Sequence, residues 1–241
     1  MVDANESCAS IPGVRARWLA ENNADNAVGG FTGTAVGNVT YGPGKYGNAF
    51  QFNGTTSAIK VDDMEMLWPT GSFSIEAWIK AAPSFTGTGI ALIKYACADV
   101  CIAPNDKAYY ALYMVSGAPA VDIRSNSEAN ILKLINTSKV VNDNIWHHLV
   151  GVRDNTNLML HLYVDGTLST SMALTQSQIG AMSDLDANLD YVIMGAAPTT
   201  GTSTVLDTFF PGAVDNPAYY DRALTAAEVL DLYEKPEGAC P

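Results

Sequence analysis

Hydrophobic and polar residues alternate most regularly between Trp146 and Gly166. Two runs carry the pattern, namely Trp146, His148, Val150 and Val152, and then Leu158, Leu160, Leu162 and Val164. A period of two residues is typical of a strand with one buried face. Asp154 to Asn157 separates the runs with turn-forming residues, and Gly166 permits a second reversal. The stretch predicts an antiparallel hairpin with one face buried.

Similar runs on both sides of this hairpin predict further strands. They cover residues 15–19, 49–52, 58–61, 73–80, 90–95, 109–115, 120–124, 132–135, 191–194 and 213–220. The passage from Glu21 to Asn38 is rich in Asn, Gly and Thr and predicts a loop. One helix is predicted near the end of the chain, because Thr225 and Glu228 form a capping box. Many short strands without an internal repeat favour a single all-β domain over residues 1–241, with a core of about 15–233.

Composition restricts the classes of partner. The chain has 241 residues and a net charge of −12, with 48% hydrophobic and 16% charged residues. This balance favours a globular fold and disfavours nucleic acid and anionic membranes, since polyanions would be repelled. No apolar run reaches the roughly 20 residues that span a bilayer, so we expect no membrane insertion.

Four cysteines allow three disulfide pairings. Because chain termini often lie close together, we predict a Cys8–Cys240 disulfide, and a Cys97–Cys101 disulfide across a short loop. These pairs imply an oxidising compartment. The alternative is that Cys97 and Cys101 form half of a zinc site, which would need two more Cys or His ligands.

The order of the motifs resembles the laminin-G-like members of the concanavalin A-like lectin/glucanase superfamily, especially bacterial extracellular modules. The resemblance rests on the segments at 18–25, 44–54, 73–80, 146–150, 162–166 and 215–229. It implies a jelly-roll sandwich of two antiparallel sheets, with the termini close together. One departure is Asp215-Asn216-Pro217, where relatives commonly have Asp-Glu-Val, and a Pro there indicates an edge strand or a bulge.

The resemblance implies a structural calcium ion held by Asp215 together with backbone oxygens near Trp18 and Gly54. Asp25 or Asn26 would complete the set, although relatives often have Asp where Asn26 stands. Hard cations take six to eight oxygen ligands, which carboxylates and loop carbonyls supply. A second candidate is the acidic run at residues 184–190, but it lacks the Gly and Glu of a calcium loop and fits an ordinary acidic turn better.

Catalysis is not expected. Glucanases of this superfamily place their acids on one strand, whereas Glu76 stands alone on the strand at 73–80. An unrecognised pair of Glu76 and Asp122 is the alternative, and ion pairing with Lys94 and Arg124 is the simpler interpretation. His147 and His148 are adjacent on a strand, so they point to opposite faces and are poorly placed to share a metal ion.

Alternation also predicts a binding surface. If Tyr110, Leu112 and Met114 face the core, their neighbours face outward. The predicted ligand-binding residues are Glu76, Trp78, Lys94, Tyr109, Tyr113, Asp122 and Arg124. Aromatic rings pack against sugar rings, and charged groups bond to hydroxyls. We therefore expect a non-catalytic carbohydrate-binding module of a larger secreted or cell-surface protein, in an extracellular or periplasmic setting. A protein-interaction or adhesion domain is the alternative, and a polysaccharide lyase or glycoside hydrolase ranks below it.

Overall fold

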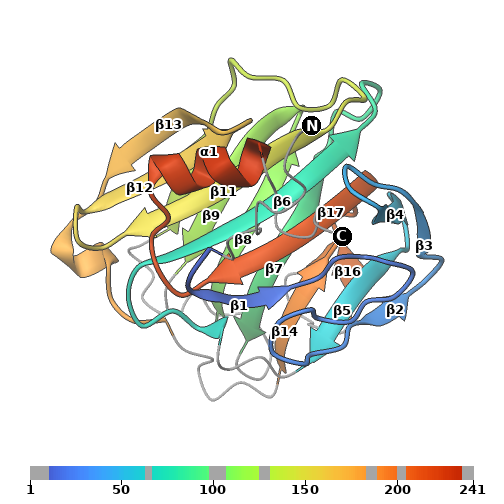
Figure 1. The fold of residues 1–241 in the computed structure, drawn as a ribbon, viewed down its shortest axis with the longest axis horizontal. Helices are drawn as coiled ribbons and strands as arrows, with labels where there is room; N and C mark the ends of the chain where they lie inside the picture. The colour runs from blue at the N-terminus through green and yellow to red at the C-terminus, as the bar shows by residue number, and fades with distance from the viewer. Residues whose placement is uncertain are drawn as a thin grey trace, which may run out of the picture.

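Two antiparallel sheets stack face to face in the computed structural model, which describes residues 11–62, 67–97, 107–124, 131–182, 189–199 and 205–234 (Figure 1). One sheet has eight strands and the other has seven, while β15 (Ala197–Pro198) and β16 (Leu206–Asp207) form a small separate pair. The predicted all-β, concanavalin A-like sandwich with one short helix is therefore confirmed among these residues.

The eight-stranded sheet contains the predicted hairpin. Its order is β13 (Thr167–Ala173), β12 (Met159–Val164), β11 (His147–Asp154), β6 (Phe73–Ala81), β17 (Pro211–Tyr220), β4 (Asn48–Asn53) and β3 (Thr40–Pro43), with β1 (Val14–Arg17) also paired to β17. Neighbouring strands far apart in sequence, such as β6 and β17, make this sheet a product of long-range pairing.

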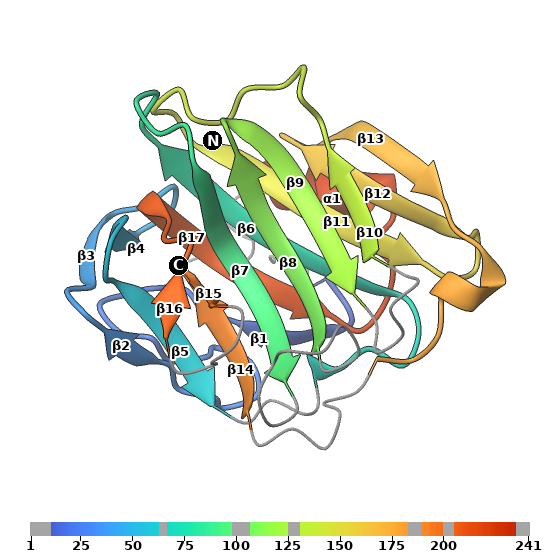
Figure 2. The same cartoon turned by 180° about the vertical axis from the view of Figure 1, so that it is seen from behind.

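The seven-stranded sheet lies behind the first in Figure 1 and faces the viewer in Figure 2. Its order is β10 (Ile131–Ile135), β9 (Ala118–Arg124), β8 (Lys107–Val115), β7 (Thr88–Cys97), β14 (Leu189–Met194), β5 (Ala58–Asp62) and β2 (Thr34–Val36). Strands β7 to β10 follow one another along the chain as a meander.

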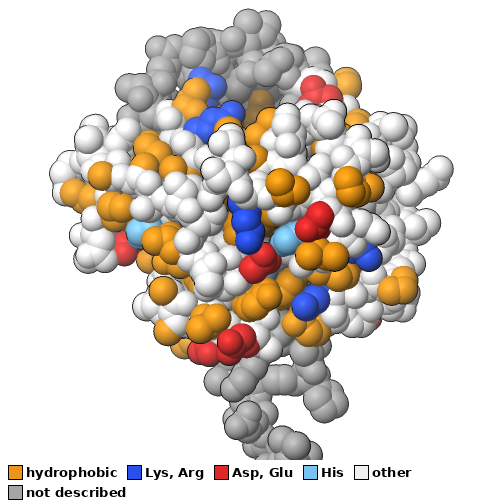
Figure 3. All heavy atoms as spheres, turned by 90° about the horizontal axis from the view of Figure 1, so that it is seen from above, with side chains coloured by type: hydrophobic (Ala, Val, Ile, Leu, Met, Phe, Trp, Pro, Cys, Tyr) orange, Lys and Arg blue, Asp and Glu red, His pale blue; other side chains and the backbone are white. Residues whose placement is uncertain are grey.

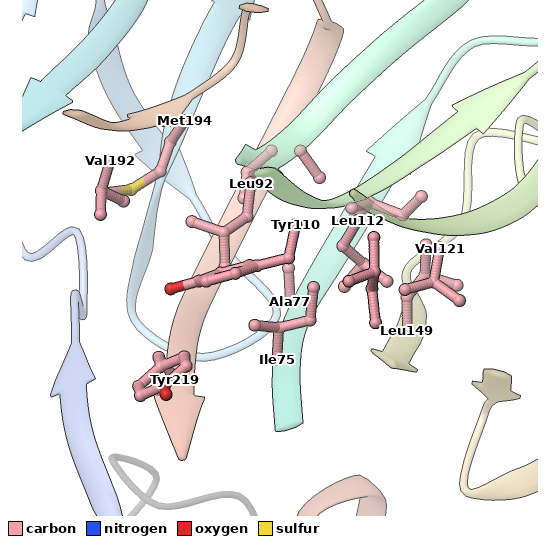
Figure 4. Packing of buried hydrophobic residues seen from close by; sticks show 14 of the residues in the cluster. Ile75, Ala77, Leu92, Tyr110, Leu112, Val121, Leu149, Val192, Met194 and Tyr219 are labelled. Carbon is pink, nitrogen blue, oxygen red and sulfur yellow. The ribbon is translucent and has the colours of Figure 1, made fainter. Parts of the chain in front are cut away.

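Side chains from the facing surfaces of the two sheets fill the core. Ile75, Ala77 and Leu149 from the eight-stranded sheet meet Leu112 and Val121 from the seven-stranded sheet (Figure 4). All are buried, as expected for an interior packed at the density of an organic crystal. Gly151 lets the sheets approach here, because an added Cβ would lie 2.7 Å from the Val121 side chain.

Helix α1 (Ala226–Glu234) lies on the outer face of the eight-stranded sheet (Figure 1). Its predicted capping box is confirmed, since the Thr225 amide donates to Glu228 at 2.8 Å and the Glu228 amide donates to the Thr225 hydroxyl. Val229 and Leu232 pack on Val150 and Val152. The expectation of one buried face in β11 is therefore wrong, because Leu149 faces the core while Val150 and Val152 lie under the helix.

Strand β17 carries the irregularity that Pro217 predicts. Its pairing with β6 shifts between Asp215 and Ala218, and Asn216 has a φ of 49°. The strand is central in the sheet, so the feature is a bulge and not an edge. The bulge turns Asp215 toward the loop at Gly44–Gly47.

Three strands with mainly polar or exposed residues, β2, β3 and β13, were not predicted from the sequence. Residues 34–36 fall inside the predicted loop at 21–38, and β3 and β13 were also missed. All three are edge strands of their sheets, where a buried face is narrow and the hydrophobic alternation is weak.

Two sequence predictions lie outside the described residues. They are the disulfides, since Cys8, Cys101 and Cys240 are not described, and the acidic run, whose residues 184–188 are not described. Within the described ranges, no helix has the length and apolar character needed to cross a bilayer.

Candidate functional site

A pocket of about 300 Å³ opens on the outer face of the seven-stranded sheet. We call it the tyrosine pocket. Ile93 and Ala111 form an apolar floor, and Ala197 and Pro198 line one side. The polar and aromatic side chains that line it are Tyr95, Tyr109, Tyr113, Asp122, Arg124 and Lys133.

Strand alternation places these side chains together, as predicted for β8 and β9. Tyr110, Leu112 and Met114 lie in the core, so Tyr109 and Tyr113 point outward. The strand register sets Tyr109 opposite Arg124, and Ala111 opposite Asp122. Lys133 lies opposite Asp122 on β10. The predicted residues Tyr109, Tyr113, Asp122 and Arg124 therefore share one pocket.

The three tyrosines give the pocket its shape. The rings of Tyr95 and Tyr109 stack on each other with centroids 6.4 Å apart and an interplanar angle of 16°. Both residues line the pocket, so this aromatic pair forms part of its wall. The Tyr113 ring has the Lys133 ammonium nitrogen 5.8 Å from its centroid. Such aromatic edges and faces suit a ligand that is part apolar and part hydroxylated.

Asp122 gives the pocket a buried carboxyl group. Burial raises its pKa, while the Lys133 charge and a hydrogen bond from Tyr109 oppose the rise. That bond, from the Tyr109 hydroxyl to Asp122 Oδ2, is 3.4 Å long and therefore weak. Burial and the nearby Asp122 charge raise the pKa of Tyr113, so its hydroxyl stays protonated at neutral pH. The pocket can thus donate and accept hydrogen bonds.

Glu76 does not belong to this surface, and its prediction as an exposed ligand-binding residue is wrong. It lies on the outer face of the other sheet, 2% exposed, in a polar cluster with Arg17 and Tyr220. Arg17 Nη2 lies 3.3 Å from Glu76 Oε1, and the Tyr220 hydroxyl donates to Oε2 at 3.1 Å. Burial opposes ionisation, but the charge of Arg17 and the hydrogen bonds of the cluster lower the Glu76 pKa overall.

Trp78 is also misplaced by the prediction. It is buried on the same face as Glu76, with its ring stacked 4.9 Å from His148 and 5.5 Å from Tyr233 of helix α1. The Lys45 ammonium nitrogen lies 4.4 Å from its ring centroid. The helix therefore occupies the aromatic surface that the sequence predicted to be open.

Lys94 faces the opposite way from the tyrosine pocket. It is fully buried, in contact with Asp190, with its ammonium nitrogen 4.7 Å from the centroid of Trp68. The Trp68 indole donates to the same Asp190 at 3.0 Å. Its prediction as an outward binding residue is wrong, because it sits on the core-facing side of β7.

The alternative catalytic pair fails on the same geometry. Glu76 lies on the outer face of one sheet and Asp122 on the outer face of the other, so the sandwich separates them. The simpler interpretation, ion pairing of these two acids with Lys94 and Arg124, is wrong for Glu76 and Lys94, since Glu76 pairs with Arg17 and Lys94 with Asp190. His147 bonds to Asp165 at 2.9 Å and Asp143 at 3.1 Å, whereas His148 lies under helix α1.

The predicted calcium ligands are only partly brought together. Asp215 is fully buried, and its Oδ2 accepts the amides of Lys45 and Tyr46 at 2.8 and 3.0 Å. Its Oδ1 has no hydrogen-bond partner within the described ranges. Burial and the neighbouring Glu21 charge raise the Asp215 pKa to about 7. A calcium ion takes six to eight oxygen ligands, and Asp215 Oδ1 and the carboxylate of the neighbouring Glu21 are the side-chain oxygens that could contribute to such a set here.

The other predicted ligands lie elsewhere or are engaged. Gly54 adjoins Pro211, four residues and roughly 13 Å along β17 from Asp215, so its place in the set is wrong. Asn26 Oδ1 already accepts the amides of Arg17 and Val28. Asp25 accepts a bond from Thr32, and the Trp18 amide donates to Pro217 near the bulge. In the described ranges no three His, Cys, Asp or Glu side chains cluster as a metal site.

Sequence reasoning missed three residues of these sites. Tyr95 and Lys133 lie on predicted strands, and alternation with Ile93 and with Leu132 and Leu134 could have placed both on the outer face. Glu21 carried no such signal, because it lies in a polar loop and only folding brings its charge close enough to raise the Asp215 pKa.

The chain belongs to the concanavalin A-like lectin/glucanases superfamily, whose family description matches residues 53–230. No curated protein matches it in sequence. Among solved structures it is similar to domain 4 of AbnA, a GH43 extracellular arabinanase from Geobacillus stearothermophilus, in complex with arabinotriose. That likeness has 21% identity and a TM-score of 0.64, and covers 91% of this chain and 98% of that domain.

Two toxin domains are also similar. The binding domain of Paraclostridial Mosquitocidal Protein 1 has 15% identity and a TM-score of 0.68, with 92% of this chain and 52% of that chain covered. The ligand-binding domain of botulinum neurotoxin serotype D, in complex with N-acetylneuraminic acid, has 14% identity and a TM-score of 0.67, with 92% and 50% covered. The chain thus spans about half of these toxin domains.

Proposed function

We propose that this chain is a non-catalytic carbohydrate-binding module of a secreted or cell-surface protein, and that the tyrosine pocket holds its glycan. The observation that carries the proposal is the convergence of Tyr95, Tyr109, Tyr113 and Asp122 over an apolar floor. Glycan recognition combines apolar packing of the sugar ring with hydrogen bonds to its hydroxyls.

The similar structures support this class of ligand. One is bound to arabinotriose and another to N-acetylneuraminic acid, and the first belongs to an extracellular enzyme. Because identity is low, the sugar itself does not transfer from these proteins to this chain. The net charge of −12 supports a ligand that is not a polyanion.

A binding role is favoured over hydrolysis by the carboxyl groups at the pocket. Among the described lining residues, Asp122 is the acid, whereas glycoside hydrolysis uses two carboxyl groups on either side of the bond.

On the face of the molecule shown in Figure 3, acidic and basic side chains are interspersed, which does not favour a polyanionic partner there.

Calorimetric titration with a panel of trisaccharides tests the proposal. The neutral members are arabinotriose, xylotriose, cellotriose and galactotriose, and the acidic members are trigalacturonate and sialyllactose. We expect at least one to bind, and Ala111→Trp to abolish that binding by filling the pocket floor. Ala227→Trp on the exposed side of helix α1 is the matched control. Silence of the whole panel would overturn the proposal and favour a protein-interaction domain.

We also propose a structural calcium ion at Asp215 and Glu21. The support is the buried, unpartnered Asp215 Oδ1 and the adjacent second carboxylate. When bound, calcium would supply positive charge that holds both carboxyl groups ionised and fixes the Gly44–Gly47 loop to β17. Trp18 and Asn26 form an isolated β-bridge just after β1, and the Trp18 amide donates to Pro217, two residues from Asp215. These contacts position β1 beside the proposed calcium site.

The pH dependence of stability tests the calcium site. Without calcium, the raised pKa of Asp215 means that the folded state holds a proton between about pH 4 and 7 that the unfolded state has already released. The free energy of unfolding therefore falls as pH rises across this window. Calcium should abolish that fall and raise the melting temperature at pH 8. In Asp215→Asn, calcium should have no effect. An equal melting temperature in EDTA and calcium would contradict the proposal.

A further inference from the structure

Two polar groups of the tyrosine pocket have no hydrogen-bond partner among the residues that the structure describes. They are the hydroxyl of Tyr113, a residue 5% exposed, and the Oδ1 of Asp122, a residue 8% exposed. Both residues line the pocket. Buried polar atoms are nearly always bonded, since leaving one unpaired is costly. Two such atoms at one site therefore need an explanation.

The two groups are neighbours on one face of the sheet. Asp122 pairs with Ala111, and Tyr113 lies two residues further along the same strand, which makes Tyr113 and Asp122 a diagonal cross-strand pair. The Asp122 charge acts directly on the Tyr113 hydroxyl. One group accepts hydrogen bonds and the other, being protonated, donates one. Together they complement a pair of adjacent hydroxyl groups.

We propose that Asp122 and Tyr113 bind two neighbouring hydroxyls of an uncharged sugar ring, one donating to Asp122 Oδ1 and the other accepting from the Tyr113 hydroxyl. The inference rests on the proposed function and names its ligand class as neutral glycans. The C–H face of the same ring packs on the apolar floor at Ile93 and Ala111.

The charges around this corner favour a neutral ring over an acidic one. A ligand carboxylate at this corner would lie beside the buried Asp122 carboxyl group, whose pKa stays raised although Lys133 and Arg124 oppose the rise, so a second negative charge is unfavourable there. Lys133 stands opposite Asp122, and its positive charge interacts with the Asp122 carboxylate. The Lys133 ammonium group is therefore not an unused cation for a ligand carboxylate. Lys133 is exposed and joined by no ion pair among the described residues, so its flexible chain can move aside when a ring enters.

Affinity measurements on isosteric variants test this pairing. With the strongest neutral ligand of the trisaccharide panel, Asp122→Asn should weaken binding about tenfold or more, and Tyr113→Phe about three- to tenfold. Asp62→Asn and Tyr191→Phe are the matched controls, because both lie on the same sheet outside the pocket, and both should stay within about twofold. Galactotriose should bind better than trigalacturonate, which replaces hydroxymethyl groups with carboxylates.

A stability measurement separates a ligand-binding role from a structural one. Because the Tyr113 hydroxyl has no partner in the described part of the chain, Tyr113→Phe should leave the melting temperature of the free protein unchanged or higher. A lower melting temperature with unchanged affinity would overturn the pairing. So would stronger binding of the acidic sugars. If the wild-type chain binds no sugar, the proposed function fails as well, whereas binding that is unaffected by both variants defeats this inference alone.

Discussion

The two outer faces of the sandwich carry similar residues but differ in what lies over them. On the eight-stranded sheet, Glu76 bonds to Arg17 and Tyr220, and Tyr233 of helix α1 stacks over the neighbouring Trp78. On the seven-stranded sheet, Tyr113 and Asp122 keep unpartnered atoms at an open pocket. Among the described residues, unpartnered polar atoms occur on both faces, Asp215 Oδ1 on the eight-stranded sheet included, so the open pocket beside them is what distinguishes the proposed ligand-binding face. The aromatic and charged residues alone do not distinguish the two.

The largest expected effect comes from the covered face. Glu76→Ala leaves the Arg17 guanidinium buried without its carboxylate, which should lower the free energy of unfolding by about 3–5 kcal/mol. Glu76→Gln keeps the shape and should cost less. Urea denaturation measures both. A Glu76→Ala variant as stable as the wild type would show that this face is not the buried structural one.

A smaller effect is expected where His147 joins the end of β11 to two carboxylates. Burial would lower its pKa, but the bonds and charges of Asp165 and Asp143 raise it overall above 6.5. The resulting stabilisation is fully present below about pH 6.5 and is lost as pH rises through the raised folded pKa. Asp143→Asn, at an exposed position, should reduce stability at pH 6 by less than about 1 kcal/mol.

Nuclear magnetic resonance titration of the imidazoles provides the control for that prediction. Burial lowers the pKa of His161 on β12, with Asp154 opposing it, so His161 should titrate below His147. The reverse order would contradict the assigned pairing of His147.

Loss of the helix cap should have a local effect of similar or smaller size. Thr225→Ala removes the hydroxyl that accepts the Glu228 amide and should cost about 1 kcal/mol. Helix α1 should fray without exposing the tyrosine pocket on the opposite face, so glycan affinity should not change. A Thr225→Ala variant with weakened glycan binding would indicate that the two faces are coupled.

Much of the fold was predictable because central strands have a buried face. The runs at 73–80, 109–115 and 120–124 gave correct strands, and the inward and outward sides of β8 and β9 were also correct. The polar strands β2, β3 and β13 escaped because edge strands need little hydrophobic alternation.

The site was only half predictable for a related reason. Alternation shows which residues share a face of a strand, but not what covers that face. Glu76 and Trp78 looked exposed because their partners, Tyr220 and Tyr233, lie about 150 residues away in sequence. Lys94 was misplaced because its charge suggested an outward position, whereas its buried partner Asp190 lies 96 residues away in sequence.

Amide chemical-shift mapping tests the central claim most directly. Titration of the labelled chain with the strongest-binding trisaccharide should shift resonances around Tyr95, Ala111 and Asp122 on β7, β8 and β9. Resonances of β6 and helix α1 should stay in place. Shifts confined to β6, helix α1 or the loops around Asp215, with β8 and β9 unaffected, would contradict the assignment of the open face as the ligand-binding face.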